Sequence, residues 1–166
     1  MLKGQDIVVL AAVIGNRRAY ETYAELGSRT GISASEAHAS VRRLRESALI
    51  GEDRHVLRRN VVDFLVHGLR YVFPARADGR IVSGIPTSYA APVAKDAFSV
   101  CGEVPVWQTA NGGTRGMSVE PLYPTAPDAA SRDRELYDRL AVFDMLRMGR
   151  LRERLFAEQK LKAMLA

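Results

Sequence analysis

Residues 23–50, YAELGSRTGISASEAHASVRRLRESALI, predict a helix, a tight turn and a second helix with a basic outer face. Ser33 and Glu36 have the spacing of a capping box, in which each side chain accepts a hydrogen bond from the backbone amide of the other residue. Gly31 can take the left-handed conformation that ends a helix, which places the turn at residues 30–32. A new helix is therefore expected over residues 33–47.

The expected helix divides into an apolar face and a polar face. Ala37, Val41 and Leu44 follow the i, i+4, i+7 spacing of a buried stripe. The remaining faces hold Ala34, Ser35, His38, Ala39 and Arg42. A helix divided in this way could lie in a major groove, with Ser35 and His38 at base edges and Arg42 on a guanine or a phosphate. The alternative is an amphipathic helix of any small helical domain, whose outer face is solvated by Arg42, Arg43 and Arg45.

The residues that follow favour the first interpretation. A short turn at residues 51–57, between two apolar pairs, predicts a small β-hairpin, and helix, helix, hairpin is the order of a winged helix. The segments LGSRTGIS and SEAHASVRRLRESALI resemble winged-helix regulators of the MarR-like type over roughly residues 3–60. This resemblance implies a winged helix-turn-helix fold that binds duplex DNA. The expected wing carries Glu52 and Asp53, which leaves Arg54 as its candidate DNA contact.

The composition is compatible with such a function. The chain has 166 residues, a formal charge of +5 and 47% hydrophobic residues, enough for a packed core. Residues 1–74 carry 11 Lys and Arg against 8 Asp and Glu, residues 75–127 carry 4 against 4, and residues 128–166 carry 9 against 7. We therefore expect an anionic partner at the helical ends of the chain. The single Cys101 excludes an internal disulfide and fits a cytoplasmic location.

Two further helices are predicted, one before and one after the helix-turn-helix. Residues 3–15 are apolar at nearly every position from 7 to 14, which indicates a buried helix that could form a dimer contact and is too short to span a membrane. Thr22 and Glu25 form a second capping box. Past the hairpin, Asn60 is expected to cap a helix that Pro74 ends, with a core stripe at residues 62, 65, 69 and 72. Arg58 and Arg59 precede it, either as DNA-backbone contacts or in a solvated turn.

The second half of the chain changes character. Residues 75–127 hold six of the seven prolines and three β-like runs, at residues 80–85, 104–109 and 115–122, with a hairpin turn expected at 110–113. This segment is either a small β subdomain or an extended arm that wraps a neighbour. Helices return from residue 128, with Asp133 as a cap and Gly149 as a break. They are expected to serve oligomer or partner contacts, or to close the core of one subunit.

Motifs for catalysis or metal binding are not evident. His38, His55 and His67 lie in separate predicted elements without the spacing of a zinc site, and no nucleophile-elbow motif occurs. We therefore expect neither an enzyme nor a cofactor nor a bound metal.

The sequence predicts an α+β protein, mainly α, with a winged helix over residues 1–74, a β and loop segment over 75–127 and helices over 128–166. Its expected function is transcription regulation as a cytoplasmic homodimer that binds double-stranded DNA. The candidate DNA-binding residues are Ser33, Ala34, Ser35, His38, Arg42, Arg43, Arg54 and Arg58. The alternative is an antitoxin or accessory protein whose residues 75–166 bind a partner protein.

Overall fold

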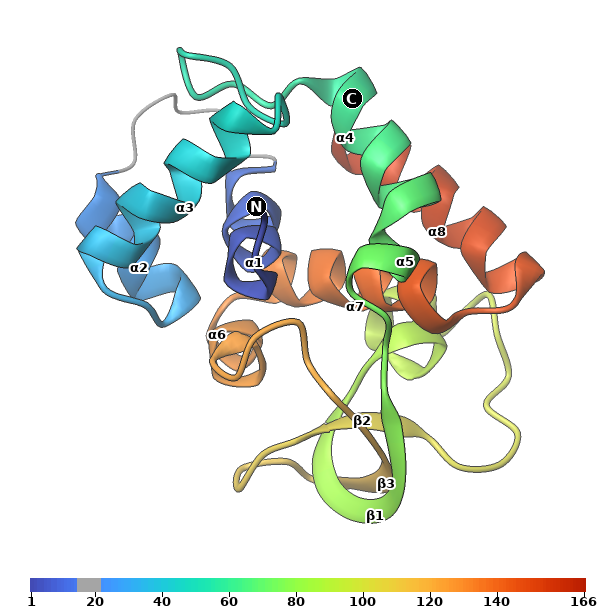
Figure 1. Cartoon of the computed structure of the whole chain (residues 1–166). Helices are drawn as coiled ribbons and strands as arrows, with labels where there is room; N and C mark the ends of the chain where they lie inside the picture. Colours follow the sequence, from blue (N-terminus) through green and yellow to red (C-terminus); the bar gives the residue numbers. More distant parts are fainter. Residues whose placement is uncertain (15–21) are drawn as a thin grey trace.

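The first helix lies at the centre of the molecule (Figure 1). In the computed structural model, which describes residues 1–14 and 22–166, α1 (Gly4–Val13) packs against α2 (Tyr23–Thr30), α3 (Ala34–Glu46) and α7 (Arg134–Met148). The side chains of residues 7–12 are at most 1% exposed. The predicted burial of this helix is thus confirmed. Because the helices that bury it belong to the same chain, α1 is not free to form a dimer contact. The expected end of this helix at Gly15 lies outside the described residues.

Both predicted capping boxes are present. The Ser33 hydroxyl accepts from the Glu36 amide at 3.2 Å, and the Glu36 carboxylate accepts from the Ser33 amide at 2.9 Å. Thr22 and Glu25 make the same reciprocal pair at 3.1 and 2.7 Å. These bonds satisfy amides that have no partner inside the helix, so they fix where α2 and α3 begin.

The turn between α2 and α3 is held by a residue from the second half of the chain. Gly31 ends α2 with φ +75°, the left-handed conformation expected for it. The Thr125 hydroxyl donates to the Thr30 carbonyl at 2.8 Å, and a Cβ on residue 31 would lie 2.9 Å from Thr125 Cβ. Glycine is therefore required here both for its backbone conformation and for this close approach.

The helix after the hairpin differs from the prediction in its start and its buried face. It runs through α4 (Arg58–Asp63), the π-helical turn η1 (Phe64–Gly68) and α5 (Leu69–Val72). Asn60 is not its cap: α4 begins earlier, and the Asn60 amide donates to the Ala48 carbonyl at 2.7 Å. The buried stripe is Val61, Leu65 and Leu69, at 0% exposure, whereas Val72 is 53% exposed. The wider π turn keeps residues four apart on one face.

Residues 75–127 contain a small three-stranded sheet, called the β subdomain below. The strands are β1 (Ala77–Pro86), β2 (Pro105–Gln108) and β3 (Thr114–Val119), close to the three expected runs. β1 pairs antiparallel with both others, and β2 pairs parallel with β3 through Pro105 with Met117 and Val106 with Ser118. The expected β2–β3 hairpin is thus wrong. Each strand pairs with the other two, so the sheet closes on itself without a free edge.

Two glycines allow this closure. A Cβ on Gly84 would lie 2.0 Å from the Trp107 carbonyl oxygen, and one on Gly116 would lie 2.0 Å from that of Val104. Real Cβ atoms do not approach backbone oxygens so closely. The strands can therefore meet at these two points only because no side chain stands between them.

The helix α7 joins the subdomain to the rest of the molecule. It follows α6 (Ala126–Arg132) and precedes α8 (Leu151–Met164), with Asp133 as its cap and Gly149 as the break, both as predicted. Asp144 on α7 is 1% exposed, accepts from Thr87 at 2.7 Å and Trp107 at 2.8 Å, and pairs with Arg147 at 2.6 Å. Short helices η2 (Ser88–Ala90) and η3 (Pro92–Ala94) also pack on α7.

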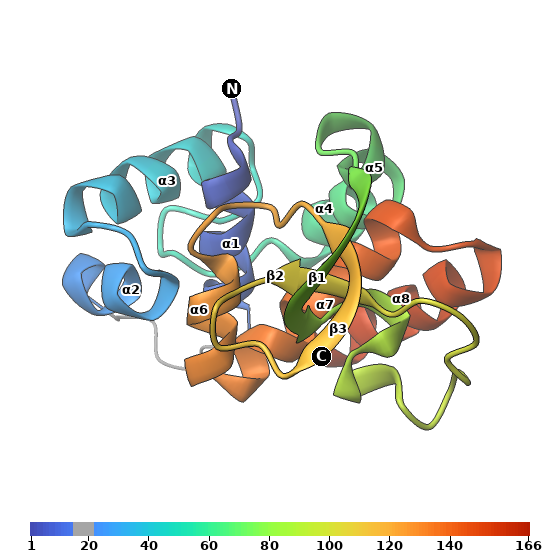
Figure 2. The same cartoon turned by 90° about the horizontal axis from the view of Figure 1, so that it is seen from below.

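The expected fold class, mainly α with a small β part, is confirmed. Figure 1 shows the strands below the helices, and Figure 2, which is seen from below, shows them in front of the helices. One hydrophobic core is continuous through the three expected segments, from Ile7 to Leu165, and includes Trp107 from β2. No helix in residues 1–14 and 22–166 is long and apolar enough to cross a membrane.

Candidate nucleic-acid interface

The outer face of α3 is open to solvent. Ala34, His38 and Arg42 are exposed at i, i+4 and i+8, and Ser33 and Ser35 are exposed beside the start of the helix. On the opposite face Ala37, Val41 and Leu44 are at most 2% exposed, which confirms the predicted core stripe. We call the residues Ser33, Ala34, Ser35, His38 and Arg42 the α3 outer stripe.

A ring from α2 joins the outer stripe to the loop after α3. The Tyr23 ring meets the His38 ring edge to face, with centroids 4.9 Å apart at 87°. The Arg54 guanidinium lies 4.4 Å from the centre of the same Tyr23 ring. Cation–π attraction restrains the guanidinium over the face of the ring. No local sequence pattern predicts the contacts that Tyr23 makes with His38 and Arg54, which lie 15 and 31 positions further along the chain.

The loop that carries Arg54 is a reduced form of the expected hairpin. It has one β-bridge, between Ile50 and Val56, and Arg54 has φ +63°. The Arg45 side chain donates to the Glu52 carbonyl at 3.0 Å. The loop is therefore fastened to α3 through Arg45 and to α2 through Arg54.

Arg42 keeps its charge at the surface. Its side chain is 65% exposed, and its Nε lies 3.8 Å from a Glu46 carboxylate oxygen one turn further along. Exposed ion pairs of this kind are worth roughly 0–1 kcal/mol. A more strongly bound anion can therefore replace Glu46 at the Arg42 guanidinium at little cost. Glu36, at the other end of the helix, has a lowered pKa because the Ser33 amide and hydroxyl donate to its carboxylate.

Arg43, the neighbouring candidate, points the other way. Its Nε and Nη2 donate to the two oxygens of Asp6 at 2.8 and 2.6 Å, and its side chain is 14% exposed. These bonds stabilise the charged guanidinium and raise the pKa of Arg43. The expectation that Arg43 contacts DNA is therefore corrected: it ties α3 to α1. The spacing of residues within the helix could not show that Arg42 is exposed and Arg43 is paired, because the partner of Arg43, Asp6, is 37 residues away.

Arg58 lies at the first turn of α4 and is exposed. Together with Arg59 and Lys162 it borders a groove of about 320 Å³ whose apolar lining includes Val62 and Leu165. The structure therefore places Arg58 beside the end of α8 and does not join it to the outer stripe of α3.

Within residues 1–14 and 22–166, no three side chains of His, Cys, Asp or Glu lie together in a way that could hold a metal ion. The three histidines lie on α3, in the loop after it and in η1. Comparison with protein-family models, curated proteins and solved structures found no match to this chain.

Proposed function

We propose that the protein binds duplex DNA through the outer stripe of α3 and regulates transcription. The observation that carries this proposal is the exposure of Ser35, His38 and Arg42 on a capped helix, behind a glycine turn. The N-terminal residues of a recognition helix are those that reach base edges in helix-turn-helix proteins. Serine donates to or accepts from either base type, and arginine pairs with guanine.

Electrostatics also support this surface. Arg42 lies on the helix itself, and Arg54 is held on Tyr23 next to His38. The Tyr23 ring already restrains the Arg54 side chain, so little side-chain entropy is lost when Arg54 binds a phosphate. Glu52 and Asp53 are exposed in the same loop and limit how deeply it can approach the DNA backbone.

Replacing Arg42 by Ala is expected to weaken binding to the DNA upstream of the protein's own reading frame by about tenfold. The substitution removes one contact to a guanine or a phosphate. A bidentate arginine–guanine pair contributes about 1–3 kcal/mol of discrimination against the wrong base. For a phosphate contact the slope of log K against log salt also falls by roughly one unit. Fluorescence anisotropy at two salt concentrations measures both quantities.

Arg76→Ala is the matched control, since Arg76 is exposed between α5 and β1 and its removal changes net charge equally. Its effect should stay within the small non-specific change expected from net charge. If both variants bind alike at every salt concentration, α3 is not the DNA-binding element.

We propose that the protein acts as a homodimer through the first half of α8. Leu151 and Leu155 lie four residues apart on one face of the helix and are 64% and 53% exposed. Further along, Ala157, Leu161 and Leu165 are buried in the core. Two copies of a helix-turn-helix protein read half-sites about one helical turn apart. An exposed leucine pair provides an apolar contact without disturbing the core.

Changing Leu151 and Leu155 together to Glu is expected to convert the dimer to a monomer, because it places two like charges in the contact. Light scattering after size-exclusion chromatography reports the mass, and unfolding should be unchanged because both side chains are exposed. Tyr71→Glu, at a 77% exposed apolar position on α5, is the control and should remain dimeric. A parent protein that is monomeric at all concentrations would contradict this assignment.

A further inference from the structure

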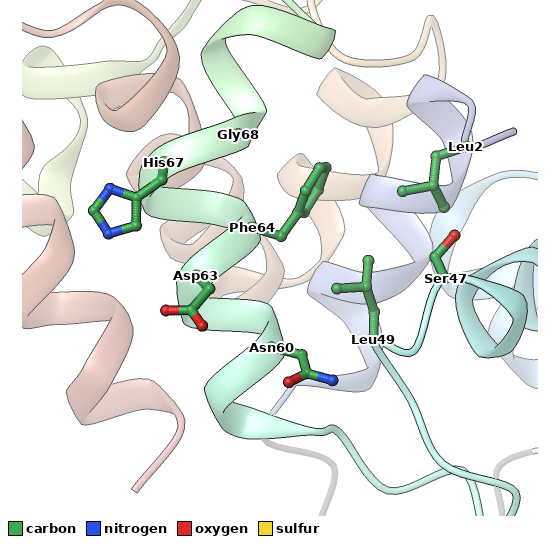
Figure 3. Close-up of a pocket in the computed structure, with 8 residues that line it drawn as sticks. All are labelled: Leu2, Ser47, Leu49, Asn60, Asp63, Phe64, His67 and Gly68. Carbon is green, nitrogen blue, oxygen red and sulfur yellow. The ribbon is translucent and has the colours of Figure 1, made fainter.

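Two grooves flank the helix that begins at Arg58, one on each side. Figure 3 shows the groove toward α3, across which Leu2, Leu49 and Phe64 point toward one another. Asp63 lies on the opposite side of the helix in this view, toward the ribbon of α8. That side holds the other groove, of about 320 Å³, between the first turn of α4 and the last turn of α8. The carboxylate of Asp63 therefore belongs with the groove toward α8.

The apolar part of the groove between α4 and α8 comes from both helices. Val62 on α4 is half-buried, Leu165 at the end of α8 is 6% exposed, and both pack into the hydrophobic core. The two helices are in contact here. The volume lies at the lower end of the range of about 300–1,000 Å³ that is typical of small-molecule sites. The groove therefore suits a short apolar chain.

Three cations border this apolar lining, namely Arg58, Arg59 and Lys162. Arg58 and Val62 are four residues apart on α4, and Lys162 and Leu165 are three apart at the end of α8, so each helix places a charge beside an apolar side chain. The stems of arginine and lysine lie along apolar surface while their charged groups stay in water. The groove thus combines an apolar lining with a cationic rim.

The two arginines have no partner in the described part of the chain. The side chains of Arg58 and Arg59 are exposed and make no hydrogen bond or ion pair there. Lys162 is 57% exposed and pairs with Glu158, one turn earlier on α8, at 2.6 Å. Asp63 is the only acidic side chain of the lining, and it forms no ion pair with the three cations. An excess of positive charge therefore remains at the rim.

We propose that the groove between α4 and α8 binds a small alkyl carboxylate, with its head group on Arg58 and Arg59 and its alkyl chain against Val62 and Leu165. A planar guanidinium matches a carboxylate with two parallel hydrogen bonds, which favours this head group. Asp63 opposes such a ligand by like-charge repulsion, so its removal strengthens binding. This inference goes beyond DNA binding and does not depend on it, because the groove shares no residue with the α3 outer stripe.

The test titrates octanoate, butanoate, acetate and octylammonium into the ¹⁵N-labelled full-length protein. Octanoate is expected to give saturable amide shifts at residues 58–63 and 162–166, and octylammonium to bind roughly fivefold more weakly. Because the alkyl chain contributes to binding, the affinity should rise about two- to fourfold for each CH2 group from butanoate to octanoate. Acetate should not saturate the site, since it carries the head group without the chain.

Three variants separate the charges. Arg58→Gln with Arg59→Gln keeps two good helix formers and removes both charges, so the octanoate affinity should fall roughly fivefold, to that of octylammonium. Arg76→Gln with Arg115→Gln removes two exposed arginines of the β subdomain and should leave the affinity unchanged, because distant exposed charges are screened at physiological salt. Asp63→Asn should strengthen octanoate binding about threefold. All five side chains are exposed, so unfolding should be unaffected.

Equal affinity for octanoate and octylammonium, or a preference that survives the loss of both arginines, would overturn the charge assignment. So would weaker octanoate binding after Asp63→Asn. Acetate binding as tightly as octanoate would show attraction to surface cations alone and would overturn the apolar part of the site. Shifts centred away from residues 58–63 and 162–166, or no saturation with octanoate, would overturn the site itself. None of these measurements involves DNA, so their failure and the failure of the proposed DNA binding are separate results.

Discussion

Replacing Asp144 by Ala is expected to lower the free energy of unfolding by about 3–5 kcal/mol, the cost of leaving a buried charge without its partner. Arg147 would keep three backbone carbonyls as acceptors, those of Phe73, Pro74 and Glu120, but would lose its only counter-ion within residues 1–14 and 22–166. Its side chain is 3% exposed, so bulk solvent does not reach the guanidinium. Thr87 and Trp107 would lose their acceptor as well.

The loss can be located as well as measured. Trp107 is the only tryptophan and donates to Asp144, so its fluorescence reports on the link between β2 and α7. Urea unfolding followed by this fluorescence and by far-UV circular dichroism gives the free energy. Asp138→Ala, on the same helix, removes a 26% exposed carboxylate that pairs with Arg134, and should cost less than about 1 kcal/mol. An equal loss in the two variants would contradict a special role for Asp144.

Replacing Arg43 by Ala is expected to lower the free energy of unfolding by about 3 kcal/mol, since the Asp6 carboxylate is fully buried and would be left without its bidentate partner. The neighbouring Arg42→Ala should change it by less than about 0.5 kcal/mol, because that side chain is mostly exposed. Thermal or urea unfolding of the two variants makes the comparison directly.

A double variant tests the mechanism behind the Arg43 result. Asp6→Asn combined with Arg43→Met removes both charges while keeping an acceptor for the Lys3 amide, which Asp6 binds at 2.7 Å. It should be more stable than Arg43→Ala alone, because no uncompensated charge remains. The Arg43→Ala protein, where it is folded, should bind DNA as the parent does. A specific loss of DNA affinity at unchanged stability would restore Arg43 to the interface.

The fold was predictable where the interactions are local. The capping boxes at Thr22 and Ser33 and the cap at Asp133 involve residues three positions apart, and each is present; Gly31 ends α2 as expected. The strands of residues 75–127 were also recognisable from their composition. Their pairing was not, because the parallel contact of β2 with β3 depends on where β1 crosses both.

The candidate site follows the same division. The exposed positions of α3 follow from helical periodicity, so the exposure of His38 and Arg42 could be predicted from the sequence alone. Tyr23 was missed as the support of Arg54, and Arg43 was placed on the wrong side, since both depend on contacts between helices. Asn60 was expected to cap a helix and instead holds Ala48, twelve residues earlier.

By itself, the sequence determined where α2, α3 and α7 begin and which stripe of α3 is apolar, because hydrogen bonds and side-chain periodicity within a few residues decide both. Only the tertiary structure decided which charges are buried, how the strands close and which residues line the groove between α4 and α8. Asp6 with Arg43 and Asp144 with Trp107 are each 37 positions apart, and their contacts exist only once α1 and α7 have formed the common core.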